Sequence, residues 1–230
     1  MKGNKTSNNR QLLITVLLRF ALVIILIGLI VFLPAGTIKF WEVWVYFGIL
    51  FIPMIFVLTY LLKNDPELLE RRMKMKEKEE PQKVFVKLSI LVFLIAFIIP
   101  GIDHRFEWSE VPFIVIIIAD LFIFIGYLLF FLVLKENTYA SRIIQVEKDQ
   151  RVISTGLYAI VRHPMYVAVI MMYVLSPLAL GSYWAVVAVL PLPVLIIFRI
   201  KSEEKILIDK LPGYREYTQE VKYRLIPYIW

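Results

Sequence analysis

The sequence predicts an all-α integral membrane protein with about six transmembrane helices. Of its 230 residues, 60% are apolar and 20% are charged, whereas soluble domains are roughly 45–50% apolar. The apolar residues form long continuous runs instead of the one-sided spacing of a surface helix. Since each crossing of a bilayer needs roughly 20 apolar residues, the chain has room for five or six spans joined by short loops.

Each predicted span is one of these apolar runs, and the first is too long for the 7–15-residue core of a cleavable signal peptide. The last two are short and separated only by Gly181, so we expect a tight helical hairpin kinked by Pro177, Pro191 and Pro193. Irregular backbone at this depth is tolerated mainly beside protein or a cavity, which predicts a pocket next to the hairpin. The six spans cover residues 12–33, 41–62, 84–100, 111–134, 166–180 and 182–198.

The distribution of basic residues predicts the topology. With six spans, 23 of the 26 Lys and Arg residues fall on one side, in residues 1–10, 63–87, 135–162 and 199–224. By the positive-inside rule, both termini and the two long loops face the cytoplasm, at the plasma membrane if the source is bacterial. Because the charge follows the topology, the net charge of +7 does not indicate nucleic acid as a partner; membrane lipids are the expected surroundings.

We expect two regions, residues 1–134 with N-terminal transmembrane helices and residues 135–230 with the functional site. Within the first, the cytoplasmic connector 63–83 alternates acidic and basic residues around a few apolar ones, which suits either an interfacial helix or a solvated linker. Asp120 lies near the middle of a span, where an acid must face protein or water.

Several function classes are disfavoured by what the sequence contains. Cysteine is absent, and the only histidines, His104 and His163, are far apart in sequence. We therefore expect no thiolate nucleophile and no metal site. No internal repeat is visible, which weakens a transporter interpretation because many transporters are built from duplicated halves.

Polar residues gather in two segments on the predicted cytoplasmic side, 145–166 and 199–228. Pro164 can begin the fifth span, which places Arg162 and His163 at a helix N-terminus suited to a carboxylate or phosphate. Arg199 and Glu203 are four residues apart and share one face of a helix. Spacing alone leaves a second interpretation open, in which they form a surface ion pair with a solvated Glu204 beside it.

Motifs in the last part of the chain resemble those of a known family. They are Gln145, QRVISTGLY from Gln150 to Tyr158, RHPMY from Arg162 to Tyr166, Phe198-Arg199, Glu203-Glu204, and GYREYTQEVKYRLIP from Gly213 to Pro227. Together, and in this order, they resemble the isoprenylcysteine carboxyl methyltransferase family. The motif RHPMY alone is less specific, since related membrane methyltransferases and some membrane reductases have similar patterns.

The resemblance implies an S-adenosylmethionine-dependent membrane methyltransferase that acts on a lipophilic, isoprenylcysteine-like carboxylate entering from the bilayer. It implies that Arg199 binds the substrate carboxylate. Gln150 stands where family members can have His, so its contact could be through the side chain or the backbone. The residues implied to line the cofactor site are Gln145, Gln150, Arg151, Val152, Ile153, Tyr158, His163, Pro164, Met165, Tyr166 and Glu203.

Three alternatives remain at this stage: a phospholipid amine N-methyltransferase, an NADPH-dependent membrane reductase, and a non-catalytic membrane protein. Arg199 favours a carboxylate acceptor because a planar guanidinium binds a carboxylate through two parallel hydrogen bonds. An amine acceptor would need a base to remove its proton, which a neighbouring cation hinders.

Overall fold

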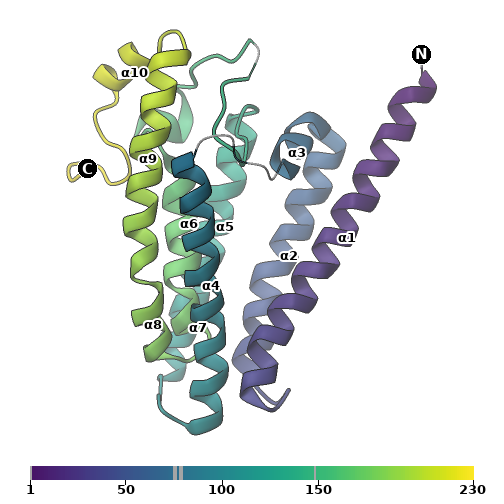
Figure 1. Ribbon diagram of the computed structural model, residues 1–230, viewed down its shortest axis with the longest axis vertical. Helices are drawn as coiled ribbons and strands as arrows, with labels where there is room; N and C mark the ends of the chain where they lie inside the picture. Colours follow the sequence, from purple (N-terminus) through teal and green to yellow (C-terminus); the bar gives the residue numbers. More distant parts are fainter. Residues whose placement is uncertain (1, 75–76, 78–79, 148) are drawn as a thin grey trace.

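The computed structural model describes residues 2–74, 77, 80–147 and 149–230, with side chains from residue 11 onward, and within these ranges all regular structure is helical. The helices are arranged as a long bundle (Figure 1). Their bounds are α1 Lys2–Ala35, α2 Trp41–Asn64, α3 Pro66–Met73, α4 Glu80–Phe106, α5 Phe113–Glu136, the short 3-10 helix η1 Gly156–Ala159, α6 Pro164–Val174, α7 Ser176–Ala179, α8 Tyr183–Val189, α9 Pro191–Lys210 and α10 Tyr214–Glu220.

Among the described residues, five helical segments are long and apolar enough to cross a membrane, which confirms the predicted all-α membrane protein. They are Gln11–Ala35, Trp41–Asn64, Glu80–Phe106, Phe113–Glu136 and Tyr183–Lys210. The remaining apolar segment, Pro164–Ala179, is shorter than the roughly 20 residues of a full crossing, so a sixth span stays a prediction.

Three predicted spans are much shorter than the observed helices. The expected span 12–33 is part of α1, which runs from Lys2 to Ala35. The expected span 84–100 is part of α4, which runs from Glu80 to Phe106, and the expected span 182–198 continues through α9 to Lys210. The helices are longer than the apolar runs because an α-helix is held by backbone hydrogen bonds, which do not require apolar side chains. Polar residues after Phe198 thereby belong to the same helix as the apolar run before them.

The predicted hairpin turns at Gly181, whose φ of +69° suits a residue without a side chain. Both of its arms are interrupted near prolines. Pro177 lies in the first turn of α7, and Pro191 begins α9, positions where the missing N–H of proline has no helical partner to lose.

The connector between α2 and α4 begins with a packed helix. The Asp65 side chain caps α3 by accepting a hydrogen bond from the Leu68 N–H at 2.9 Å. Leu68 and Leu69 are fully buried in a cluster that includes Leu61 of α2. Arg19 of α1 donates to the Met73 carbonyl oxygen at 2.7 Å. In α3 the apolar side chains therefore face protein, and residues 75–76 and 78–79 of the connector lie outside the described ranges.

The N-terminus, α3 and α10 lie at one end of the bundle (Figure 1), an arrangement consistent with the predicted topology; which side of the membrane this end faces stays a prediction. At the other end, buried Asp103 accepts hydrogen bonds from the backbone N–H and hydroxyl of Ser109, both at 2.7 Å, and from the Ser182 hydroxyl. This carboxylate joins the end of α4 to the turn of the hairpin.

α4 packs against α1, α8 and α9, and α5 packs against α6. Close approach depends on glycine at two places. A Cβ atom on Gly101 of α4 would collide with the Val31 carbonyl oxygen of α1, and one on Gly126 of α5 would lie 2.9 Å from Cγ of Met172. The first contact brings α1 close to α4, and the second brings α6 close to α5.

We predict that Gly101→Ala lowers the free energy of unfolding by about 1–3 kcal/mol, as overpacking typically does, because α1 must move away from α4. Thermal unfolding in detergent, followed by tryptophan fluorescence, measures the effect. Gly48→Ala is the matched control, since a Cβ there has only the Ile52 side chain within reach at 4.0 Å. Equal melting temperatures for the two variants would contradict the close α1–α4 contact.

Candidate functional site

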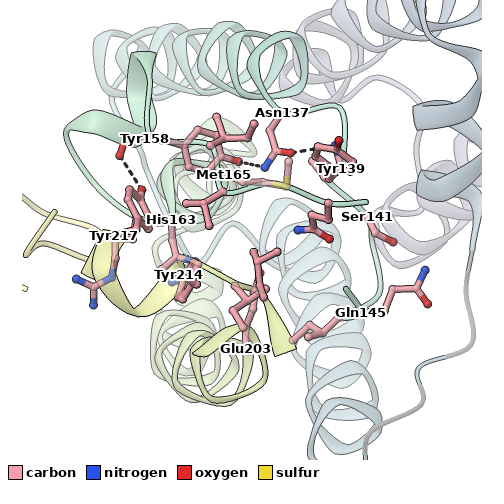
Figure 2. Close-up of a pocket in the computed structure, with 18 of the residues that line it drawn as sticks. Asn137, Tyr139, Ser141, Gln145, Tyr158, His163, Met165, Glu203, Tyr214 and Tyr217 are labelled. Atoms are coloured by element: carbon pink, nitrogen blue, oxygen red, sulfur yellow. Dashed lines mark hydrogen bonds between the residues drawn. The ribbon is translucent and has the colours of Figure 1, made fainter. Parts of the chain in front are cut away.

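A cavity opens at the end of the bundle that carries α3 and α10 (Figure 2). Its walls come from the segment 137–153, η1, the start of α6, α9 and α10. The empty space between its walls is about 840 Å³, including the solvent at its open mouth. The two polar segments noted in the sequence therefore meet around one hollow.

Ten of the eleven residues predicted to line a cofactor site lie in the wall of this cavity. They are Gln145, Gln150, Arg151, Val152, Ile153, Tyr158, His163, Met165, Tyr166 and Glu203. Pro164 is buried outside the wall at the first position of α6, where its fixed dihedral orients its neighbours. That these residues bind a cofactor stays a prediction.

The wall also contains polar residues that were not predicted to line a cofactor site. Tyr214 and Tyr217 belong to α10 and lie in the motif that begins at Gly213, but the resemblance gave them no role. The other three lie shortly before the first polar segment. The five residues are Asn137, Tyr139, Ser141, Tyr214 and Tyr217.

Tyr158 is held in place from two directions. Asn137 donates from its side-chain amide to the Tyr158 hydroxyl at 2.9 Å, and the Tyr217 hydroxyl donates to the Tyr158 carbonyl oxygen at 2.7 Å (Figure 2). Burial raises the pKa of Tyr158 to about 12, so the phenol is neutral at physiological pH. The ring is a fixed, uncharged aromatic surface on the cavity wall.

The Gln150 side chain is directed toward its own loop. Its amide oxygen accepts a hydrogen bond from the Glu147 N–H at 2.8 Å, and the Gln145 amide donates to the Glu147 carboxylate. Lys74 pairs with the same carboxylate at 3.1 Å. These contacts stabilise the loop that carries Arg151 and Val152 past the cavity.

Glu204 is the buried centre of an ionic cluster. Only 4% of the residue is exposed. Its carboxylate accepts hydrogen bonds from Arg162 Nε at 2.6 Å, His163 Nε2 at 3.3 Å and Arg224 Nε at 2.6 Å. The interpretation of Glu204 as a solvated neighbour is wrong, because basic groups from two other segments compensate its burial.

The start of α6 is also joined to the C-terminal segment by its backbone. The N–H groups of residues 162–163 donate to the carbonyl oxygens of 223–224, each at 2.9 Å. Arg162 Nη1 donates to the carbonyl oxygens of 221–222 at 2.6 and 2.9 Å. The backbone N–H groups of Arg162 and His163 and the Arg162 guanidinium are therefore engaged by the protein itself.

Arg199 and Glu203 do not pair directly. The Arg199 Nε donates to the Tyr166 hydroxyl at 2.8 Å, and this hydroxyl donates to Glu203 at 2.6 Å. Arg199 is buried, so the surface ion pair considered from spacing is wrong. Tyr166 is the link between the arginine and the acid.

Arg199 lies in a second pocket rather than in the wall of the cavity. This pocket is formed mainly by α4, α6 and α9, as expected beside the hairpin, and it shares Tyr166 with the cavity. Its polar end contains Glu77, Arg142 and Arg199. The rest of the lining is largely apolar and comprises Phe85, Val86, Ser89, Ile90, Phe93, Val169, Tyr173, Leu192 and Ile196.

Asp120 lines neither of these two pockets. It is 3% exposed, and its carboxylate oxygens have no hydrogen-bond partner among the described residues. His104, one of the two histidines considered as metal ligands, stacks on Phe40 with ring centroids 4.0 Å apart. Within the described ranges, no group of three His, Cys, Asp or Glu side chains is placed to hold a metal ion.

We predict that Glu204→Gln lowers the free energy of unfolding by about 3–5 kcal/mol, because it leaves a buried arginine without its counter-ion. Asp209→Asn, on an exposed position of the same helix, should change it by less than about 0.5 kcal/mol. Denaturant or thermal unfolding in detergent compares the two. A Glu204 variant as stable as the control would show that the cluster does not hold these segments together.

Comparison with known families identifies part of the chain. Residues 115–209 match the family model described as the isoprenylcysteine carboxyl methyltransferase family. The match begins in α5 and ends in α9, so it includes the cavity wall up to Leu207, Arg199 and Glu204. No curated protein matches the chain.

Proposed function

We propose that this chain is a membrane methyltransferase that uses S-adenosylmethionine to O-methylate a carboxylate on a lipophilic, isoprenylcysteine-like substrate. The match of residues 115–209 to the isoprenylcysteine carboxyl methyltransferase family model supports this proposal. The observation that carries this proposal is the junction of two pockets at Tyr166. One pocket has both polar and apolar walls, and the other is largely apolar with Arg199 at its end.

The cavity fits S-adenosylmethionine by the chemistry of its wall. Glu203 offers a carboxylate for ribose hydroxyls or an ammonium group, and Tyr158 offers a neutral aromatic surface for adenine. Gln150 would contribute through its backbone, since its side chain bonds to Glu147. When bound, S-adenosylmethionine supplies a methyl group on a positively charged sulfur.

The second pocket fits a substrate with an acidic end and an apolar body. Its apolar wall on α4, α6 and α9 suits an isoprenoid that arrives from the bilayer, whereas the Arg199 guanidinium suits a carboxylate. The acidic end would then lie next to Tyr166, on the boundary with the cofactor cavity.

The proposed reaction needs no general acid or base from the protein. A carboxylate is already ionised at neutral pH, and methyl transfer to it converts an anion and a cation into two neutral groups. The residues therefore act by orienting the carboxylate on Arg199 and by excluding water. The hydrogen bonds from Arg199 to Tyr166 and from Tyr166 to Glu203 keep the two binding regions in a fixed relation.

We predict that purified protein binds S-adenosylhomocysteine and not NADPH, as calorimetry in detergent would measure. Glu203→Gln should weaken this binding by about tenfold or more, because charge-assisted hydrogen bonds contribute about 1.5–3 kcal/mol. Glu216→Gln, an exposed acid on α10, is the matched control. Absence of S-adenosylhomocysteine binding by the wild type would refute the proposed cofactor.

We predict that membranes containing the protein transfer a labelled methyl group to N-acetyl-S-farnesylcysteine as a base-labile ester. Arg199→Lys should raise the KM for this acceptor by about tenfold or more, since Lys lacks the planar fork, and leave S-adenosylhomocysteine affinity nearly unchanged. Arg215→Lys, at an exposed site, is the control. A base-stable product would instead indicate N-methylation, and equal damage to both ligands would contradict the role of Arg199.

A further inference from the structure

We propose that Glu77 is an internal competitor for Arg199, which the substrate carboxylate must displace in order to bind. The inference rests on the proposed function and extends it to substrate selection. Glu77 lies between α3 and α4, far in sequence from the motifs of the family match, and its side chain is at the polar end of the second pocket.

The contact between the two residues is direct and buried. Glu77 Oε1 lies 3.1 Å from Arg199 Nη2, and the two side chains are 5% and 8% exposed. The other carboxylate oxygen of Glu77 accepts a hydrogen bond from the Ile144 N–H at 3.3 Å. The carboxylate is thus held at the position where an incoming acid would meet the guanidinium.

The donors of Arg199 show what a substrate would have to replace. A guanidinium has five N–H donors in a planar fork. Nε donates to Tyr166, and Nη2 donates to Glu77 and to the Arg142 carbonyl oxygen at 2.8 Å. Nη1 makes no hydrogen bond within the described part of the chain, and the Phe85 ring covers the guanidinium at 4.7 Å. Because both N–H groups of Nη2 are already engaged, a carboxylate can bind Nη1 and Nη2 together only if one of these two acceptors leaves. Glu77 is the negatively charged acceptor of the two, and it is the one that would repel an incoming carboxylate.

The segments around Glu77 are anchored to the loop that lines the cofactor cavity. Lys74 pairs with Glu147 at 3.1 Å, and Arg71 Nη1 donates to the Thr138 carbonyl oxygen at 2.6 Å. Glu77 itself contacts Ile144 of the same loop. The carboxylate therefore stays close to Arg199 at a high effective concentration.

This arrangement has two consequences. A buried guanidinium without a partner is unfavourable, and Glu77 supplies the counter-ion when no substrate is bound. A small free acid gains only the contact that Glu77 already makes, so it competes poorly. An acid with a long apolar tail also fills the pocket along α4, α6 and α9, and this extra burial favours displacement. Glu77 thereby makes recognition depend on both the carboxylate and the apolar tail.

The test compares two ligands on two proteins saturated with S-adenosylhomocysteine. Calorimetry measures binding of N-acetyl-S-farnesylcysteine and of its carboxamide to the wild type and to Glu77→Gln, whose amide keeps an oxygen acceptor for the Ile144 N–H. We expect the variant to bind the acid about tenfold more tightly, about 1.4 kcal/mol, and the carboxamide equally well. In turnover, the KM for the acid should fall without loss of kcat.

Glu80→Gln is the matched control, because Glu80 lies in the same connector region but pairs with Lys83 and has a side chain that is 80% exposed; it should change neither affinity. Unchanged S-adenosylhomocysteine affinity in Glu77→Gln would show that the fold is intact. Weaker acid binding, an equal gain for both ligands, or no change would each overturn the inference.

The same experiment separates this inference from the proposed function. A wild type that fails to bind S-adenosylhomocysteine would count against the proposed cofactor, whereas the ratio of acid to carboxamide affinities in the two proteins judges Glu77. Acid binding to neither protein would overturn both the proposed substrate and the role of Glu77.

Discussion

The arrangement of the site depends on one buried carboxylate, that of Glu204. It receives hydrogen bonds from Arg162 at the start of α6 and from Arg224 in the C-terminal segment, both at 2.6 Å. A buried charge is tolerated only when its partners are close and numerous, so this cluster determines how three distant segments come together. The segments that carry Arg162 and Arg224 meet α9 at Glu204. The preceding residue, Glu203, lines the cavity.

Two neighbouring pockets of different chemistry follow from this arrangement. Neighbouring acids on α9 have separate tasks: Glu204 holds the fold, and Glu203 lines the cavity. One turn earlier, Arg199 faces the largely apolar second pocket, and Tyr166 bonds to both Arg199 and Glu203. The two pockets thus place polar side chains next to a largely apolar surface, with Tyr166 between them.

Much of the fold and of the cavity could be predicted because the signals are local. Apolar runs identified the long helices, Gly181 identified the turn of the hairpin, and the family motifs named ten residues of the cavity wall. Helix ends were less predictable, since α9 continues into charged residues. The roles of Glu204 and Glu77 were missed because each depends on partners from other segments, which no spacing along the chain reveals.

The sequence by itself determined that the protein is helical and membrane-embedded, because apolar length and backbone hydrogen bonding leave few other structures in a bilayer. It also determined which residue types are available for charge recognition. Only the tertiary structure decided which charges meet: that Arg199 contacts Glu77 and Tyr166 rather than Glu203, and that Glu204 is buried. Electrostatic pairing acts over a few ångströms in space, and positions far apart in the chain reach that distance only once the helices have packed.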